Sequence, residues 1–210
     1  MAFALVESGS ITKLMNGNKG IKIGDNQYPS SFFTAIYSEA ERNAVGVYTI
    51  EIDNTNYKDT EWYVNTDLTY SYDSSANKVK GAYGTATAKP HADVTYTSQD
   101  KTDGLIPVDK DVGDVKSRGL KYNLIQGVKS EARAILGETD WYVVRKADTS
   151  EAVPTNIATH RAAVRTKQAE METSITNAAD TAALQTLYTY TYNSETKVTS
   201  RPIGELPTLE

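Results

Sequence analysis

The sequence predicts a protein of the α+β class, with strands in the first part of the chain and paired helices in the second. Three observations predict it: alternating apolar and polar residues between 57 and 97, apolar residues spaced by three and four between 120 and 175, and a polar stretch rich in Asp and Lys between these regions. We expect an N-terminal antiparallel β-rich module at 1–88, a polar linker at 89–114, and a helical hairpin followed by a β-hairpin at 115–210.

The first fifty residues are typical of short strands around one helical turn. Two apolar runs within Phe3–Leu14 flank a Gly-bearing turn, which predicts a hairpin. Ser38 and Glu41 have the spacing of a capping box, so a short helix should begin there. The segment Gly46–Ile52 then returns to strand character.

The clearest strand pattern lies between Trp62 and Asp73, where one parity is mostly apolar and the other mostly polar. The apolar parity consists of Trp62, Val64, Thr66, Leu68, Tyr70 and Tyr72. Turn residues at 73–77 follow, so Lys78–Thr87 should return as the second strand of a hairpin.

A segment near the C-terminus is similar to part of this hairpin. Thr69-Tyr-Ser-Tyr-Asp-Ser74, followed by Lys78 and Val79, matches Thr189-Tyr-Thr-Tyr-Asn-Ser194, followed by Lys197 and Val198. The similarity covers about ten residues, which is too short for a repeat fold. The two segments are either hairpins of the same geometry or paired tyrosine-rich surfaces that grip a partner or a glycan.

Two amphipathic helices are expected after residue 117. The first has the apolar stripe Leu120, Leu124, Val128, Ala132 and Ile135 and should stop at Gly137. The second should begin at Thr155 or Asn156, just after Pro154, because a proline fits the start of a helix. Its inner face should carry Ile157, Arg161, Val164, Gln168, Met171 and Ile175.

The connection between the helices contains the apolar run from Trp141 to Val144. It is long, at roughly 18 residues, compared with the usual two to eight. A Trp side chain buries much surface and needs only one partner for its N–H. We therefore expect Trp141 to be a core or hinge anchor near the turn of the helical hairpin. A short helix capped by Asp180 and a loose tail from Glu205 should follow the second helix.

Composition excludes several functional classes. The chain has 210 residues and no cysteine, so disulfides, thiolate catalysis and cysteine-ligated metals are ruled out. The net charge of −5 and the pI near 5.2 argue against nucleic acid as a partner. No apolar run approaches the roughly 20 residues that cross a bilayer, and the start lacks the positive region of a signal peptide. We expect no membrane insertion.

No catalytic or metal-binding pattern stands out. The two histidines, His91 and His160, lie in no recognisable motif, and His160 is expected on a helix flank, with no second ligand four residues further on. The segment Asp109–Asp114 lacks the alternating ligands and final Glu of a calcium loop, and the glycines form no phosphate-binding loop. We expect no enzyme, no cofactor and no metal.

The helical region contains the order Arg-x-Ile-Leu-x-x-Thr-Asp-Trp, then Val-Pro, then Ile-x-x-x-Arg-x-Ala-Val-Arg. This order resembles the C-terminal part of a large group of bacteriophage tail proteins, which includes tail-fibre assembly proteins and uncharacterised virion proteins. The matching residues are Arg133, Ile135, Leu136, Thr139, Asp140, Trp141, Val153, Pro154, Ile157, Arg161, Ala163, Val164 and Arg165.

The N-terminal region is similar to the module that precedes the two helices in many of these proteins. The matching positions are Leu5-Val6 with Gly9, Tyr28-Pro29 with Phe32 or Phe33, and Glu39, Glu41, Arg42, Ala44, Val45, Gly46, Val47 and Tyr48. The resemblance covers residues 2–50 and 120–166, in the expected order, and leaves the linker and the C-terminal hairpin unmatched.

The resemblance implies a non-enzymatic structural component of a phage tail, attached at a fibre or the baseplate, that binds another tail protein. Such a protein would reside in the virion after assembly in the host cytoplasm, and a homo-oligomer within the virion is left open. The alternatives are a tail-fibre assembly chaperone and a receptor- or glycan-binding tail tip.

The residues that we expect at the partner interface are aromatic. The chain has 14 Tyr but only three Phe and two Trp, and an amphipathic ring suits a contact where one edge stays wet. Tyr is also a good strand former, so both explanations apply. We expect the interface to include Trp141, Tyr142, Tyr190 and Tyr192.

Overall fold

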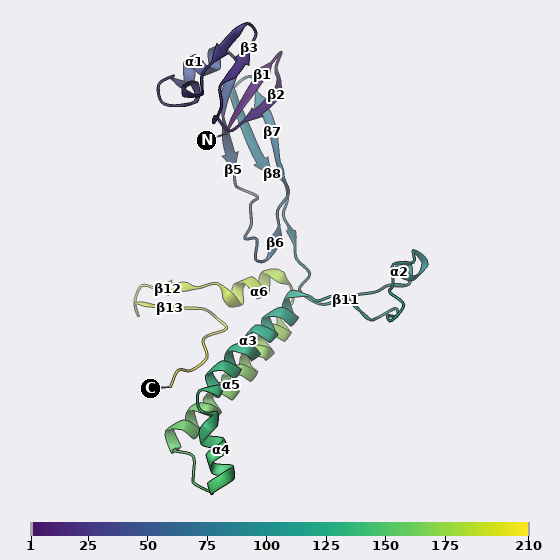
Figure 1. Cartoon of the computed structure of the whole chain (residues 1–210), viewed down its shortest axis with the longest axis vertical. Helices are drawn as coiled ribbons and strands as arrows, with labels where there is room; N and C mark the ends of the chain where they lie inside the picture. The colour runs from purple at the N-terminus through teal and green to yellow at the C-terminus, as the bar shows by residue number, and fades with distance from the viewer. Residues whose placement is uncertain (1, 210) are drawn as a thin grey trace. The chain divides into compact units, whose positions relative to one another are not determined.

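The structure, a computed structural model, describes residues 2–209 and divides into two compact units between Thr87 and Ala88 (Figure 1). Unit 1 contains a sheet curved into a half-barrel, and unit 2 contains paired helices followed by a β-hairpin. The α+β class predicted from the sequence is therefore confirmed. The division falls one residue before the predicted end of the β-rich module.

The sheet of unit 1 has the strand order β2-β1-β5-β8-β7. Its strands are β1 (Phe3–Glu7), β2 (Ser10–Met15), β5 (Val47–Asp53), β7 (Leu68–Asp73) and β8 (Lys78–Tyr83). The hairpins β1–β2 and β7–β8 and the pair β1–β5 are antiparallel, whereas β5 and β8 run parallel with Ile50 opposite Val79. Both predicted hairpins are present, and the parallel pair joins them into one sheet.

The two faces of this sheet bury different residues because side chains alternate along each strand. One face carries the larger cluster, to which β1, β5 and the segment between β2 and β5 contribute. Its buried residues are Phe3, Leu5, Ile21, Phe32, Phe33 and Val47. The opposite face carries Ala4, Tyr48, Ile50 and Val79.

Small elements lie between β2 and β5: β3 (Ile21–Ile23), β4 (Asn26–Tyr28), the 3-10 helix η1 (Ser30–Phe33) and α1 (Glu39–Ala44). The predicted capping box is confirmed, because the Glu41 N–H donates to Ser38 Oγ at 3.2 Å and the Ser38 N–H donates to the Glu41 carboxylate at 2.7 Å. Gly46 follows α1 at a φ of +81°, and a Cβ there would lie 2.5 Å from the Val6 carbonyl oxygen. Only glycine fits at that position.

The continuous strand that we expected from Trp62 to Tyr72 is interrupted. Tyr63–Val64 forms β6, which pairs with β9 (Thr87–Ala88), and the chain bends before β7 begins at Leu68. The bend is fixed by side chains: Asn65 accepts from the Lys58 N–H and donates to the Lys58 carbonyl oxygen, at 2.8 and 2.7 Å. As a result Val64 of the expected apolar face is exposed.

The segment 89–114, which we expected to be a linker, contains ordered elements of unit 2. Its β10 (Val94–Thr95) and α2 (Ser98–Thr102) form an arm together with the return strand β11 (Val115–Ser117), which follows the segment (Figure 1). At the tip, the Lys116 ammonium donates to the Asp100 carboxylate at 2.5 Å, which lowers the pKa of Asp100. At the base, Asp93 accepts hydrogen bonds from the Arg118 side chain and the Gly119 N–H.

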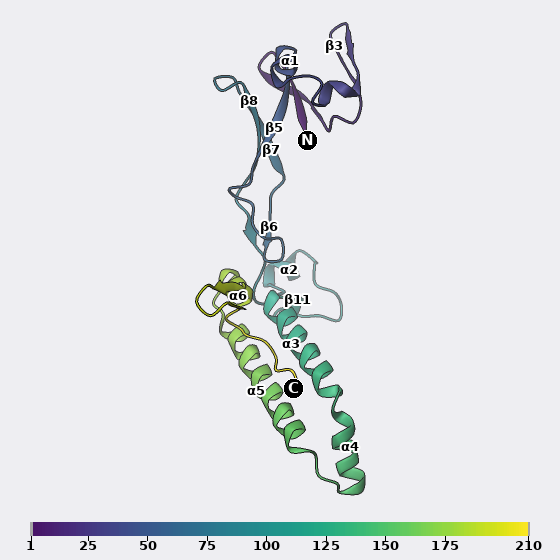
Figure 2. The same ribbon diagram turned by 90° about the vertical axis from the view of Figure 1, so that its left-hand side faces the viewer.

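The main helices of unit 2 are α3 (Leu120–Gly137) and α5 (Thr155–Asn177), which lie side by side (Figure 2). The predicted inner face of α5 is confirmed at five of its six positions, since Ile157, Arg161, Val164, Met171 and Ile175 are buried. The sixth residue, Gln168, is half-buried. The connection is not a plain loop, because it contains α4 (Asp140–Thr149). No helix among residues 2–209 is long and apolar enough to cross a membrane.

The end of unit 2 consists of α6 (Thr181–Tyr188) and the hairpin β12 (Thr191–Asn193) and β13 (Val198–Ser200). The predicted cap of α6 is confirmed, since Asp180 Oδ1 accepts from the Ala183 N–H at 2.8 Å. The tail from Glu205, which we expected to be loose, contains Leu206, which is buried.

We expect the Tyr48 hydroxyl of unit 1 to lose its proton at a higher pH than an ordinary tyrosine. It lies 3.2 Å from the Tyr72 hydroxyl and donates to Asn77 Oδ1 at 2.9 Å, and the bond with Tyr72, followed by burial, raises the pKa of Tyr48 to about 12. The unfolded value is about 10. The stability contributed by this group is complete below pH 10 and is lost as the pH rises toward 12.

Alkaline absorbance titration checks this expectation. The wild type should show a tyrosinate step near pH 12 that Tyr48→Phe removes and that the control Tyr57→Phe, in the same unit, retains. An unchanged curve in Tyr48→Phe would contradict the assignment.

Candidate functional site

Arg161 on α5 holds the junction where α3 ends and α4 begins. Its residue surface is only 7% exposed. Nη1 donates to the Leu136 carbonyl oxygen at 2.6 Å and to Thr139 Oγ1 at 2.7 Å, and Nη2 donates to Asp140 Oδ1 at 2.8 Å. We call Arg161, Leu136, Thr139 and Asp140 the Arg161 cluster.

Each acceptor in the cluster belongs to a helix end. The Leu136 carbonyl is among the last of α3, which have no partner within the helix, and a cation is favoured there. Asp140 is the first residue of α4, where a carboxylate is favoured. The Asp140 side chain is 61% exposed, so the ion pair itself adds little, and the directed hydrogen bonds matter more. One side chain thus ends one helix and sets the start of the next.

Our expectation that Trp141 is a core or hinge anchor is wrong, because Trp141 is 54% exposed. The run from Trp141 to Val144 continues as helix α4, in which no residue is buried. The interior of the junction is occupied instead by the Arg161 guanidinium and by Thr139, which is 3% exposed. A polar cluster therefore takes the place that we had given to the indole ring.

The residues at the start of α4 form what we call the α4 surface. Trp141, Val143 and Val144 are exposed, and Tyr142 and Arg145 are half-buried. The rings of Trp141 and Tyr142 have centroids 4.6 Å apart. The Arg145 guanidinium lies 4.6 Å from the Trp141 centroid, and its Nη1 is 3.1 Å from the Glu151 carboxylate. The Arg145 side chain is therefore held beside the indole ring.

One side of α4 is hollowed. Trp141, Val144, Arg145 and Asp148 follow at spacings of three and four, so they lie on one helix face. Together with Thr149 they line an open depression of about 480 Å³. An exposed apolar face with an aromatic ring and an arginine is typical of a protein contact.

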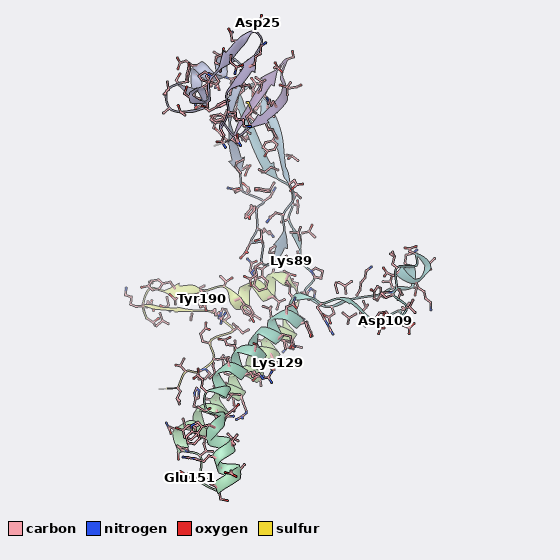
Figure 3. All side chains as sticks on the ribbon, in the orientation of Figure 1. Asp25, Lys89, Asp109, Lys129, Glu151 and Tyr190 are labelled. Atoms are coloured by element: carbon pink, nitrogen blue, oxygen red, sulfur yellow. The ribbon has the colours of Figure 1, made fainter. Side chains whose placement is uncertain are left out.

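The other two expected interface residues lie on a different part of unit 2. Figure 3 labels Tyr190, at the β12–β13 hairpin, and Glu151, which follows α4; the two lie on separate projections. The Tyr190 hydroxyl donates to Glu205 at 2.7 Å, which raises the pKa of Tyr190, and the Arg201 guanidinium lies 5.1 Å from its ring. Tyr192 is 60% exposed. The four residues therefore belong to two surfaces and not to one site.

A third apolar surface was missed from the sequence. The loop of the arm exposes Leu105, Val108 and Val112, next to Asp109, which is labelled in Figure 3. The only signal was the presence of isolated aliphatic residues in a polar stretch, and such residues are common on protein surfaces.

His160 is buried, whereas we expected it on a helix flank. Within residues 2–209, no group of three or more His, Asp or Glu side chains is arranged to hold a metal ion.

Comparisons of the chain with family models, with curated proteins and with solved structures found no match. The surfaces of unit 2 and the residues that carry the phage-tail resemblance are therefore the basis for assigning a function.

Replacing Arg161 tests whether the cluster holds the junction. Arg161→Met removes three hydrogen bonds and leaves the Leu136 carbonyl and the Thr139 hydroxyl without the guanidinium. We expect urea denaturation to give a free energy of unfolding lower by about 2–3 kcal/mol. Arg161→Lys should recover only part of the lost free energy of unfolding, because an ammonium group lacks the planar, forked set of N–H donors of a guanidinium.

The matched control is Arg133→Met on α3, which removes an exposed arginine. It should change the free energy of unfolding by less than about 0.5 kcal/mol. Equal effects of Arg161→Met and Arg133→Met would contradict the role assigned to the cluster.

Proposed function

We propose that the chain is a non-enzymatic structural component of a phage tail, a fibre- or baseplate-associated adaptor that binds another tail protein through the α4 surface. The observation that carries the proposal is a helix that buries none of its residues, exposes Trp141 and Val144, and is fixed at its start by Arg161. A ten-residue helix is marginal on its own, so this surface depends on its anchor.

Four of the residues that carry the resemblance support the proposal because they meet in the Arg161 cluster: Leu136, Thr139, Asp140 and Arg161. In Thr139-Asp140-Trp141, the first two residues accept hydrogen bonds from Arg161, and the third is 54% exposed. The spacing of the motif thus has a physical reason: two residues fix the helix start and the third is presented. A motif that served only the core would not leave its tryptophan exposed.

The side chains of the α4 surface are suited to tight contact with a protein. Trp, Tyr and Arg are the residue types that most often dominate interface energies. Here the Arg145 stack and the Glu151 ion pair limit the motion of the Trp141 ring, which reduces the entropy lost on binding. The polar residues Asp140, Lys146 and Asp148 would form the rim of this protein contact.

A tail-fibre assembly chaperone is the second candidate. It is favoured by the separate apolar surfaces of unit 2, on the arm loop, on α4 and at Tyr192 and Val198 of the hairpin. Several exposed patches would let the chain hold an unassembled fibre protein and then leave. An adaptor remains in the finished particle, so the two candidates differ in where the chain is found.

Quantitative mass spectrometry of purified particles tests the proposal. The chain should be present at a fixed, symmetry-compatible ratio to the major tail protein. Trp141→Ala should lower this ratio at least tenfold and change the free energy of unfolding by less than about 1 kcal/mol, because the ring is half exposed and a cavity is not created. Tyr57→Ala, at an exposed ring of unit 1, is the control and should leave the ratio unchanged.

Two results would count against the adaptor. Absence from particles with abundance in the lysate would identify a chaperone. Normal incorporation of Trp141→Ala would mean that the chain is attached to the particle by another surface.

A further inference from the structure

The hairpins β7–β8 of unit 1 and β12–β13 of unit 2 have the same register. Each residue of the second hairpin carries a number 120 higher than its counterpart. Tyr72 lies opposite Val79, and Tyr192 lies opposite Thr199; Asp73 lies opposite Lys78, and Asn193 lies opposite Val198.

Their turns are built in the same way. Asp73 Oδ1 accepts from the N–H groups of Ser75 and Ala76, and Asn193 Oδ1 accepts from those of Glu195 and Thr196, at 2.9 to 3.1 Å. The last turn residue has a positive φ in both, +55° at Asn77 and +60° at Lys197. The match along the first strands therefore reflects two copies of one local structure. The matched Lys197 and Val198 of the second hairpin lie one position earlier than Lys78 and Val79 do in the first.

The hairpins differ in what covers them. In unit 1, β5 adds in parallel to the outer edge of β8, Val79 is completely buried, and the Tyr72 ring packs 5.0 Å from that of Tyr48. In unit 2, β13 pairs only with β12 within the described part of the chain, and every residue of both strands is exposed. Tyr192, the counterpart of Tyr72, is 60% exposed.

No third strand joins this hairpin from residues 2–209. The residues numbered 120 higher than β5 are 167–173, and these lie in the middle of α5. An open strand edge exposes a row of unpaired N–H and C=O groups, which is a template for an added strand.

We propose that β13 accepts an extended strand from a partner protein, parallel to β13, in the way that β8 accepts β5. The partner strand completes a three-stranded sheet and covers Tyr192. This inference rests on the two hairpins alone and holds whether or not the chain is a tail protein.

The differences between the hairpins define the chemistry of that strand. In unit 1, Tyr48 of β5 donates to Asn77, and Glu51 of β5 pairs with Lys78 at 2.6 Å. Lys197 stands at the place of Asn77, and Val198 stands at the place of Lys78. The partner strand should therefore carry an acidic residue where β5 has Tyr48, to pair with Lys197, and an apolar residue where β5 has Glu51, to meet Val198.

Two synthetic peptides test the proposal on the full-length, ¹⁵N-labelled protein. The first peptide has the sequence of residues 46–53, and the second has the same sequence with Tyr48→Glu and Glu51→Val. The wild type should bind the second peptide about fivefold more tightly than the first, with shifts centred on the amides of Val198–Ser200. Tyr192→Ala should weaken this binding about fivefold, and Thr191→Ala, on the other face of β12, should not.

A reciprocal variant makes the test sharper. Lys197→Asn with Val198→Lys gives the second hairpin the residues of the first at the two contact positions, and Asn is also better suited to the positive φ. This double variant should reverse the preference and bind the first peptide about fivefold more tightly.

Three results would overturn the proposal: no shift at β13 with either peptide, the same preference in the wild type and the double variant, or shifts at β13 that grow with protein concentration when no peptide is present. The last result would identify a second copy of this chain as the occupant of the edge.

Discussion

The hydrogen bonds of Arg161 are the constraint on which the exposed helix of unit 2 depends. A buried guanidinium is costly unless its N–H groups are satisfied. Here the acceptors are a carbonyl at the end of α3, a hydroxyl at the junction and a carboxylate at the start of α4. Since these three atoms are close together in sequence, satisfying the arginine fixes the direction in which α4 leaves α3. The helix then presents Trp141, Val143 and Val144 as exposed side chains.

Unit 2 offers two contacts of different physical kinds. The α4 surface would bind through side chains, with Trp141 and Arg145 at its centre, whereas β13 would bind through backbone hydrogen bonds along an open edge. Two contacts within one unit can raise the overall affinity well above that of either one if a partner spans both. An adaptor in a large assembly would benefit from such a combination.

The parts of the fold that were predictable from the sequence depend on local chemistry. The capping residues Ser38 and Asp180, the start of α5 after Pro154 and the buried stripe of α5 each follow from residues within a few positions of one another. The parts that were missed depend on distant partners. The parallel pairing of β5 with β8 and the closure of the arm by Asp93 and Arg118 join segments about 25 residues apart or more, and no short pattern encodes them.

The candidate site was predicted in part. The sequence indicated Trp141 as a key residue and placed Arg161 on the inner face of its helix, but it gave Trp141 the buried role. The reason is physical: burial of a large ring is the commoner solution, and only the position of the Arg161 guanidinium reveals that the interior of the junction is already filled. Tyr192, which we expected at a partner interface, is 60% exposed, and the open strand edge beside it was visible only after comparison with β8.

Site-specific photo-crosslinking in assembling phage tests the central claim most directly. A photoreactive amino acid at Val144, which is exposed on α4, should form one major adduct with another tail protein, and the same group at Thr166, which is exposed on α5, should not. Introducing Arg161→Met together with the probe should abolish the Val144 adduct, because α4 loses its anchor. Equal adducts from both positions, or an adduct that persists in the Arg161→Met background, would contradict the account of α4 as a partner-binding helix held in place by Arg161.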